Sequence, residues 1–444
     1  MRARPLIAIG LAALLLAGPA AAQFSLLGLK NSLVQFALER ISVPGELEIT
    51  ADGVDEIEDG STALVGIVLS DAQGVWMRIG SLALRWNARR ILRGELDIES
   101  VVAADVEVLR RPGATPELKE DTAPAEGGSL FAWPRAPLTV RLGEMRLDRV
   151  QVAPGVIAGQ SLAFDATGAL RDEGDEQSLS LTLTRTDAVA GRIALDYLRT
   201  FRANTLKLDL AADEAAGGLV AELAGFPPDS ASRMTVAADG PLTDWQLAFN
   251  ATAERVFALD GQAVVQATGR LLVDGGAVLT PGPAIDPTAA SVLGERAALD
   301  FRIAEAEDGS GIIRVERGSL TSPHLTLSAD GTYAKPTGAA DLAIRLRGGP
   351  GLAVLAEGVA FDGFGFDGRL AGTVPGDMTA EGDLSLDDLR TAAADVGSAR
   401  LATSVTVAGA RVGFDVTGGV TGLRLDRLSP DLLGETALRA AGAF

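Results

Sequence analysis

Residues Gly74–Pro112 read GVWMRIGSLALRWNARRILRGELDIESVVAADVEVLRRP, and their pattern decides the fold. Apolar and polar residues alternate with a period of two in several short runs, which is typical of strands with one apolar face. An arginine-rich connection, Asn87–Gly94, interrupts the pattern. We therefore predict strands at Val75–Ile79, Leu82–Trp86 and Glu95–Val101, with a fourth short run at Val106–Leu109.

The composition narrows the class of protein. Gly 52 and Pro 20 in 444 residues indicate many turns, and aromatic residues make up only 5%. The net charge of −20 argues against a nucleic-acid partner, because a phosphate-binding face needs clustered Lys and Arg. The chain has no cysteine, which excludes disulfides, iron–sulfur clusters and thiol catalysis.

The N-terminus predicts export. Arg2 and Arg4 precede an apolar segment, Leu6–Leu16, which has the length of a signal peptide, and Ala20–Ala22 provide a cleavage motif before Gln23. We assign residues 1–22 to a signal peptide or, as the alternative, a signal anchor in the inner membrane. Helical spacing within Phe24–Ile41 predicts an amphipathic helix or cap over residues 23–44.

The rest of the chain reads as strands joined by turns. We predict a β segment at 45–113, a flexible loop at 114–129 and a repetitive β region at 130–444. Asp-Gly pairs ending at Gly53, Gly240, Gly261, Gly331 and Gly363 are expected to form hairpin turns, which favour antiparallel neighbours. Further strands are expected at Leu138–Leu142, Leu147–Val152, Leu179–Leu183, Leu206–Leu210, Trp245–Phe249, Leu299–Ile303, Ile312–Val315, Leu325–Leu327, Leu342–Leu346 and Val405–Val407.

Helices are expected at only two places beyond the N-terminus. Apolar residues recur at helical spacing in Glu214–Phe226, and Asp286 and Pro287 are favourable N-cap and N1 residues for a helix that ends at Leu293. Neither helix is long enough to cover a sheet of about two dozen strands.

The strands therefore offer more apolar surface than a second layer could cover. At about 4.8 Å per strand, a continuous sheet would extend on the order of 100 Å, and such a sheet must twist and curl. We predict a mainly β fold: an elongated, curled, antiparallel-rich sheet forming an open hydrophobic groove, with a few short helices. A contiguous apolar surface of this size normally marks a binding site, and an acyl chain fits a trough.

Two sets of residues are candidates for this site. The arginines of the basic connection could contact phospholipid headgroups or simply be solvated, and Trp76 and Trp86 are expected to anchor the core. The headgroup candidates are Arg85, Arg89, Arg90 and Arg93. The lipid-groove candidates are Leu82, Leu84, Trp86, Leu96, Ile98, Leu179, Leu181 and Leu183.

The stretch Leu69–Pro112 resembles the N-terminal signature of the TamB family, the translocation and assembly module subunits. PGELEITADGVDEIEDG, directly before it, and GPLTDWQLAF at Gly240–Phe249 fit as well. The resemblance implies an AsmA-like, bridge-type lipid-transfer architecture in the periplasm of a Gram-negative bacterium, anchored at the inner membrane. It also implies a TamA-like partner of the Omp85 class and a part in assembling autotransporters and other outer-membrane proteins. Family members are usually well over twice this length, so we expect the chain to be truncated at its C-terminus.

Catalytic and cofactor motifs are weak. His324 is the only histidine and is expected in a turn, so neither a Ser-His-Asp triad nor a zinc site has support. GFGFDG at Gly363–Gly368 formally matches a dinucleotide motif but lacks a following helix, and we read it as two glycine-rich turns. DEGDE at Asp172–Glu176 is read as a solvated turn rather than a calcium loop.

We therefore expect a non-enzymatic envelope protein, without cofactor, whose groove carries phospholipid acyl chains between membranes. The alternative is a scaffold that assists the insertion of outer-membrane proteins, with sheet edges that receive client strands. A third hypothesis, an outer-membrane barrel, is disfavoured because aromatic girdles are missing.

Overall fold

The computed structural model describes residues 47–56, 62–87, 90, 95–112, 139–268, 270–306, 310–350, 359–374, 376–391, 394–408, 411–425 and 436–443. The expected signal segment, the helix at 23–44 and the loop at 114–129 lie outside these residues. The described chain is mainly β with two short helices, so the predicted fold class is confirmed. No helix in these residues is both long and apolar enough to cross a membrane.

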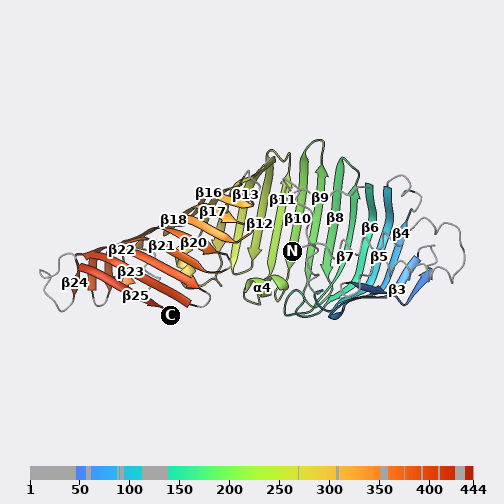
Figure 1. Ribbon diagram of the computed structural model, residues 1–444, viewed down its shortest axis with the longest axis horizontal. Helices are drawn as coiled ribbons and strands as arrows, with labels where there is room; N and C mark the ends of the chain where they lie inside the picture. The colour runs from blue at the N-terminus through green and yellow to red at the C-terminus, as the bar shows by residue number, and fades with distance from the viewer. Residues whose placement is uncertain are drawn as a thin grey trace. The chain divides into compact units, whose positions relative to one another are not determined.

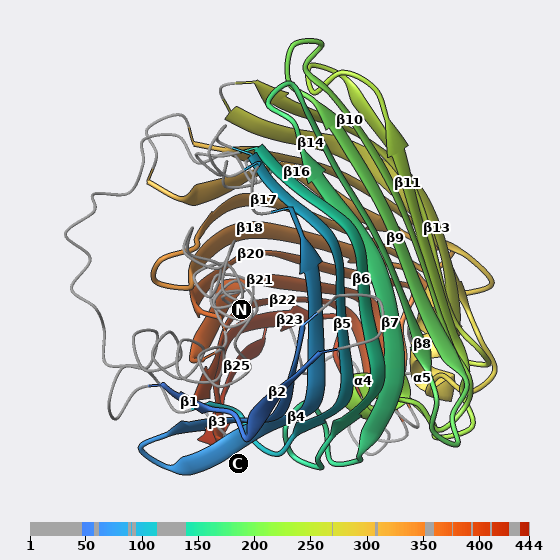
Figure 2. The same cartoon turned by 90° about the vertical axis from the view of Figure 1, so that its right-hand side faces the viewer.

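The chain divides into two compact units, with the boundary between Asp239 and Gly240. In unit 1, each strand pairs with its neighbour in a curved sheet, and the edge strands β1 and β2 both pair with β3 (Figures 1 and 2). Its strands are β1 (Glu48–Thr50), β2 (Gly53–Glu56), β3 (Thr62–Asp71), β4 (Gly74–Trp86), β5 (Glu95–Val108), β6 (Thr139–Val152), β7 (Leu162–Asp172), β8 (Glu176–Arg185), β9 (Gly191–Thr200), β10 (Thr205–Glu214) and β11 (Ser232–Asp239).

All pairings in unit 1 are antiparallel except one. Strands β5 and β6 run parallel, with Glu95 opposite Thr139 and Val108 opposite Val152. A parallel pair needs a long crossover connection, and here residues 109–138 separate the two strands. The expectation of antiparallel neighbours holds wherever the connection is short.

Unit 2 is likewise built from antiparallel neighbours, with two short strands, β19 and β24, pairing with the ends of β21 and β22 (Figure 1). Its strands are β12 (Trp245–Ala253), β13 (Phe257–Thr268), β14 (Arg270–Pro281), β15 (Ala297–Glu305), β16 (Ile312–Thr321), β17 (Leu325–Ala334), β18 (Ala339–Gly348), β19 (Val359–Ala360), β20 (Gly363–Thr373), β21 (Met378–Thr391), β22 (Ala394–Ala408), β23 (Arg411–Thr421), β24 (Arg424–Leu425) and β25 (Thr436–Ala443).

Three of the predicted strand boundaries in unit 1 are wrong. The runs Val75–Ile79 and Leu82–Trp86 belong to the single strand β4, and Glu95–Val101 and Val106–Leu109 fall together in β5 apart from Leu109. Leu138–Leu142 and Leu147–Val152 likewise join in β6, apart from Leu138. Each false boundary lies where a residue interrupts the alternation without ending the strand.

One line of residues that interrupt the alternation, called the line of bulges below, crosses four neighbouring strands at the same level without shifting their register. The pairings of β3, β4, β5 and β6 skip Gly66, Gly80, Asp105 and Arg149. Three of these residues have positive φ, which are 62° for Gly66, 55° for Asp105 and 54° for Arg149. Arg149 Nε lies 2.6 Å from Asp105 Oδ1, so the two bulged side chains pair with each other. The four interruptions are matched, so the register between these strands is the same on both sides of the line.

Glycines allow curvature in unit 2. A Cβ on Gly382 would lie 2.3 Å from the carbonyl oxygen of Asp367, and one on Gly418 would lie 2.1 Å from that of Arg400. These strands therefore approach too closely for any side chain at these positions. Asp-Gly pairs were expected to form hairpin turns, but Gly261 lies inside β13 and Gly331 inside β17. The Gly363–Gly368 segment is also strand, not two turns.

The two helices are short. The helix α4 (Leu219–Ala224) begins after Gly218 and ends at Gly225, whose φ of 68° gives a left-handed C-cap. It is shorter than the predicted Glu214–Phe226 because Glu214 still belongs to β10. The helix α5 (Pro287–Leu293) has the predicted bounds, and the Asp286 carboxylate accepts a hydrogen bond from Ala289 N–H at 3.2 Å.

The main buried cluster lies at the β3–β7 end of unit 1. Trp76, Ile79, Val106 and Val150 belong to this cluster, and Leu219 of α4 packs against it. Trp76 is 5% exposed and is a core anchor as predicted, whereas Trp86 is only half-buried. We call the face of the sheet that carries this cluster the inner face.

Candidate functional site

The strand register places three rows of mostly apolar side chains on the inner face of unit 1. Each row takes one residue from each of the eight strands β4 to β11, and neighbouring rows are two residues apart along a strand. We call these rows the apolar strip. The first row is Trp86, Ile98, Leu142, Leu170, Leu179, Tyr197, Leu208 and Ala238. The second is Leu84, Val101, Met145, Gly168, Leu181, Leu195, Leu210 and Val236, and the third is Leu82, Ala103, Leu147, Ala166, Leu183, Ile193, Ala212 and Met234.

All eight lipid-groove candidates share this face. Trp86, Ile98 and Leu179 belong to the first row, Leu84 and Leu181 to the second, and Leu82 and Leu183 to the third. Leu96 pairs with Val140, one row beyond the strip. Alternation alone placed the candidates within each strand, but only the register shows that they form continuous rows.

The strip is not covered by a second layer of the described chain. Ile193 is 41% exposed and Met234 is 40% exposed, although both are large apolar residues inside a sheet. Leu181, Leu195 and Leu210 are half-buried. At about 6.8 Å between rows and about 4.8 Å between strands, the strip is about 14 Å wide and about 34 Å long.

Polar residues bound the strip along one long side, over β7, β8 and β9. The next inner-face row contains Asp172, Gln177 and Arg199. Gln177 Nε2 donates to Asp172 Oδ2 at 3.2 Å, and Arg199 Nη1 donates to the carbonyl oxygen of Thr205 at 2.8 Å. Gln177 and Arg199 are buried, and burial raises the pKa of the neighbouring Tyr197 phenol. We call this boundary the Gln177 side.

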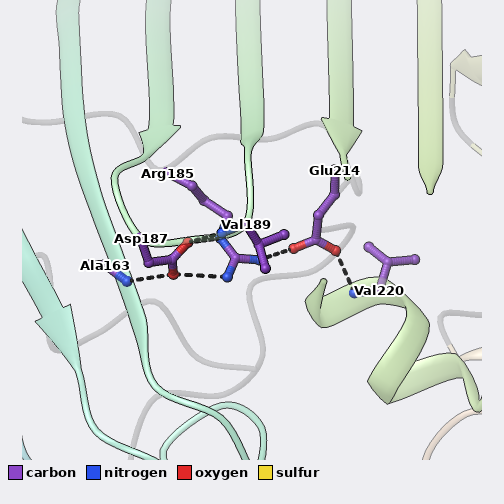
Figure 3. Close-up of polar contacts among 6 residues, drawn as sticks. All are labelled: Ala163, Arg185, Asp187, Val189, Glu214 and Val220. Carbon is purple, nitrogen blue, oxygen red and sulfur yellow. Dashed lines mark hydrogen bonds and ion pairs between the residues drawn. The ribbon is translucent and has the colours of Figure 1, made fainter. Parts of the chain in front are cut away.

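A buried charged cluster bounds the opposite long side (Figure 3). The inner-face row beyond the third row is apolar at Phe164 but contains Arg185 in β8 and Glu214 in β10. Arg185 donates to Glu214 and also to Asp187, with Nη2 lying 2.8 Å from Asp187 Oδ2. The side chains of Arg185 and Glu214 are only 8% and 11% exposed.

This cluster also holds α4. Glu214 Oε2 accepts a hydrogen bond from Val220 N–H at 2.7 Å, and Glu222 Oε1 accepts one from Gly159 N–H at 2.6 Å. We call this boundary the α4 side. Two strands, a turn and a helix therefore meet at one guanidinium and its carboxylates (Figure 3).

Hydrogen bonding favours the ionised forms of Arg185 and Asp187 despite burial. Burial opposes the charged form of Arg185, but the hydrogen bonds to Asp187 and Glu214 outweigh it and raise the Arg185 pKa. Burial likewise opposes ionisation of Asp187, but the hydrogen bonds from Arg185, Ala163 N–H and Val189 N–H lower its pKa below the ordinary value. The charges are therefore fixed parts of the groove wall.

The predicted headgroup arginines are only partly described. Arg85 lies on the outer face, where it pairs in register with Ser100, and it is exposed. Arg90 Nε lies 3.1 Å from Asp97 Oδ2, and Arg90 also pairs with Glu95. Both partners lie at the end of β5 that adjoins the Gln177 side. Arg89 and Arg93 lie outside the described residues.

Unit 2, considered alone, repeats the division into an apolar and a polar face. One row of its apolar face contains Leu299, Leu320, Leu327, Leu346, Phe366, Leu384 and Leu401. The opposite face carries ion pairs between strands, such as Arg369 with Asp341 at 2.5 Å and Arg347 with Asp367 at 2.6 Å. Phe rings lie over glycines of the apolar face, since a Cβ on Gly261 would lie 2.2 Å from the Phe249 ring.

The outer face of unit 1 offers a different kind of site. A depression of about 430 Å³ is lined mainly by outer-face residues, among them Arg171, Ser178, Asp196 and Lys207. Lys207 Nζ already lies 3.4 Å from Asp209 Oδ2. This lining suits water and ions better than an apolar ligand, so we place the candidate site on the inner face.

The other sequence motifs fall in turns or strands. His324 lies in a turn, where its N–H donates to Ser322 Oγ at 3.3 Å, and Glu173 and Asp175 lie in the expected turn between β7 and β8. Among the described residues, no group of three or more His, Cys, Asp or Glu could hold a metal ion.

The sequence reading missed the polar boundaries of the strip. Their signal is present in the alternation: Gln177 and Arg185 continue the phase of Leu179, Leu181 and Leu183 in β8. Arg199 continues the phase of Leu195 and Tyr197, and Glu214 that of Leu208 and Leu210. A polar residue in apolar phase near the end of a strand marks where the apolar rows stop.

No protein-family model matches the chain, and neither the curated proteins nor the solved structures contain a match to it.

Proposed function

We propose that the apolar strip of unit 1 holds the acyl chains of phospholipids, and that the protein carries them without catalysing a reaction. The observation that carries this proposal is the uncovered strip itself, three rows wide and eight strands long. An apolar patch of this extent is uncommon on a soluble protein without a binding partner. Each methylene buried there contributes about 0.8 kcal/mol relative to water.

The boundaries of the strip support a chain-like ligand. The charged and polar rows leave about 14 Å along the strands but about 34 Å across them, which is the length of the strip. A flexible acyl chain fits along the longer direction, and its methylene groups form no hydrogen bonds. A bulky globular ligand would have to contact the buried Arg185 or Arg199.

Site-specific photo-crosslinking tests the proposal. A photoreactive amino acid is placed at Leu84, Leu181 or Leu195, all in the middle row, and the protein is exposed to phospholipid vesicles. Matched controls carry it at Arg85, Ser180 or Asp196, which are sequence neighbours on the outer face and are exposed. We expect lipid adducts at the first three positions only. Adducts at equal yield on both faces, or no adducts in the middle row of folded protein, would refute the proposal.

The cellular setting follows from the resemblance of Leu69–Pro112 to the TamB family. We place the protein in the periplasm of a Gram-negative bacterium, tethered at the inner membrane or released by cleavage, with a TamA-like partner at the outer membrane. Fractionation of a tagged chain tests the location, and recovery in the cytoplasm would contradict it.

A second candidate function is a scaffold for outer-membrane proteins. Among the described strands, β25 pairs with β23 along one edge only, and such an edge can receive an extended client segment by β-augmentation. Crosslinks from Arg439 to unfolded barrel proteins, without lipid capture at Leu181, would favour this function over the first.

A further inference from the structure

The two long sides of the apolar strip differ in polarity beyond their buried residues. This difference concerns strands β7 to β11, where both sides are described. On each side a buried polar row ends the strip, so neither row alone says how an amphiphile would lie. The exposed groups farther out distinguish the two sides.

The α4 side exposes apolar groups. Leu219 packs inward on the buried cluster, while Val220 is 43% exposed and Leu223 is 63% exposed. The adjoining loop, which Gly159 ties to Glu222 of α4, exposes 45% of Ile157. The Arg185 guanidinium beneath already donates to Asp187 and Glu214, and only 8% of its side chain is exposed to a polar head.

The Gln177 side exposes paired charges of both signs. Arg202 and Asp175, from the two adjacent turns, lie 3.7 Å apart, with side chains 87% and 47% exposed. The half-buried Tyr197 phenol adjoins this side from the first row of the strip.

We infer that a bound phospholipid lies with its tail along the apolar strip and its headgroup over the Gln177 side, and that this side suits a zwitterionic headgroup. The inference rests on the proposed function and adds an orientation and a headgroup class. A phosphate would meet Arg202, and the cationic end of the same headgroup would meet Asp175. The α4 side would place the same charges against Val220 and Leu223, where they gain no partner.

Two photoreactive phosphatidylcholine probes test the orientation on the full chain. One carries its diazirine in the acyl tail and the other at the headgroup, and adducts are mapped by peptide mass spectrometry. We expect tail adducts at Leu181 and Leu195, and head adducts within 173–177 and 197–204. Head adducts within 156–159 or 219–224, or equally on both sides, would overturn the inference while tail adducts in the strip would leave the proposed function standing. If neither probe labels the strip, both the orientation inferred here and the proposed function are refuted.

Charge reversal tests the headgroup class. Arg202→Glu changes an exposed side chain of the Gln177 side, and Arg233→Glu is a matched control at the start of β11 near α4, also exposed. We expect Arg202→Glu to lower labelling by a phosphatidylglycerol head probe about two- to fivefold relative to phosphatidylcholine, the range of one exposed charge pair. The control should leave the ratio unchanged. An effect of equal size in both variants, or no effect in either, would refute the headgroup class assigned to the Gln177 side.

Discussion

Leu181 is the residue at which the acyl-chain proposal is most sharply tested. It lies in the middle row of the apolar strip, between Gly168 of β7 and Leu195 of β9. Replacing it by Asp puts a short carboxylate under any bound chain, and a side chain of this length cannot reach out of the groove as Lys or Arg would.

The expected cost falls on binding rather than on folding. Because Leu181 is half-buried, the new carboxylate stays hydrated in the empty groove. A bound chain would cover it, and burying an unpaired charge costs several kcal/mol. At about 1.4 kcal/mol per tenfold change in affinity, a cost of about 3 kcal/mol already weakens binding by more than 100-fold.

A fluorescent acyl probe displaced by phospholipid measures this loss, with chemical denaturation as the check on folding. Ser180→Asp is the matched control, because it adds the same charge to the same strand on the exposed outer face. Binding to Leu181→Asp should also recover as the pH falls and the new carboxyl becomes neutral. Affinities of the two variants within about threefold of each other would refute the reasoning, since that difference corresponds to less than 1 kcal/mol.

Three further predictions concern the wall and the curvature of the sheet. Arg185→Met should lower the free energy of unfolding by about 3–5 kcal/mol because it leaves two buried carboxylates without their cation. Lys207→Met, in an exposed pair, should have little effect. Equal losses of stability in a urea titration of the two variants would contradict this. The pKa of Asp187 is lowered from 3.8, so its contribution to stability is present above pH 4 and is lost as the pH falls further, and Asp187→Asn should flatten that acid limb of the stability curve. Gly382→Val should lower the free energy of unfolding by about 1–3 kcal/mol through contact with the Asp367 backbone. Gly413→Val, where nothing lies within 4 Å, should lower it clearly less in the same titration. A reversed order would show that curvature does not depend on Gly382.

Alternation in the sequence predicted part of many strands, but it did not tell which of the two sets of side chains faces the groove. It succeeded for β8 and β10, where LSLTL and LKLDL place every second residue on one face. It misplaced the ends of β4, β5 and β6 because an interrupting residue shifts the alternation by one residue, which looks in a sequence like one strand ending and another beginning. The apolar phase changes from Met77 and Ile79 to Leu82 and Leu84 across Gly80.

Other features depend on contacts that a single sequence does not display. Gly331 and Gly261 follow Asp and look like turn residues, yet a neighbouring backbone or a Phe ring occupies the space above them. The parallel pairing of β5 with β6 depends on the course of a long connection. The eight groove candidates could be chosen from the sequence, but the union of seven of them in three rows depends on the strand register.

The line of bulges through Gly66, Gly80, Asp105 and Arg149 also constrains how such a chain can change its length. A residue deleted from β4 at Gly80 would leave β3 and β5 each one residue longer at that level, and the rows beyond it would slip against one another. The four extra residues are far apart in the sequence but are held as one set by pairing. Insertions and deletions here should therefore be inherited together across the four strands, and an aligned relative that lacks one of them should lack the others.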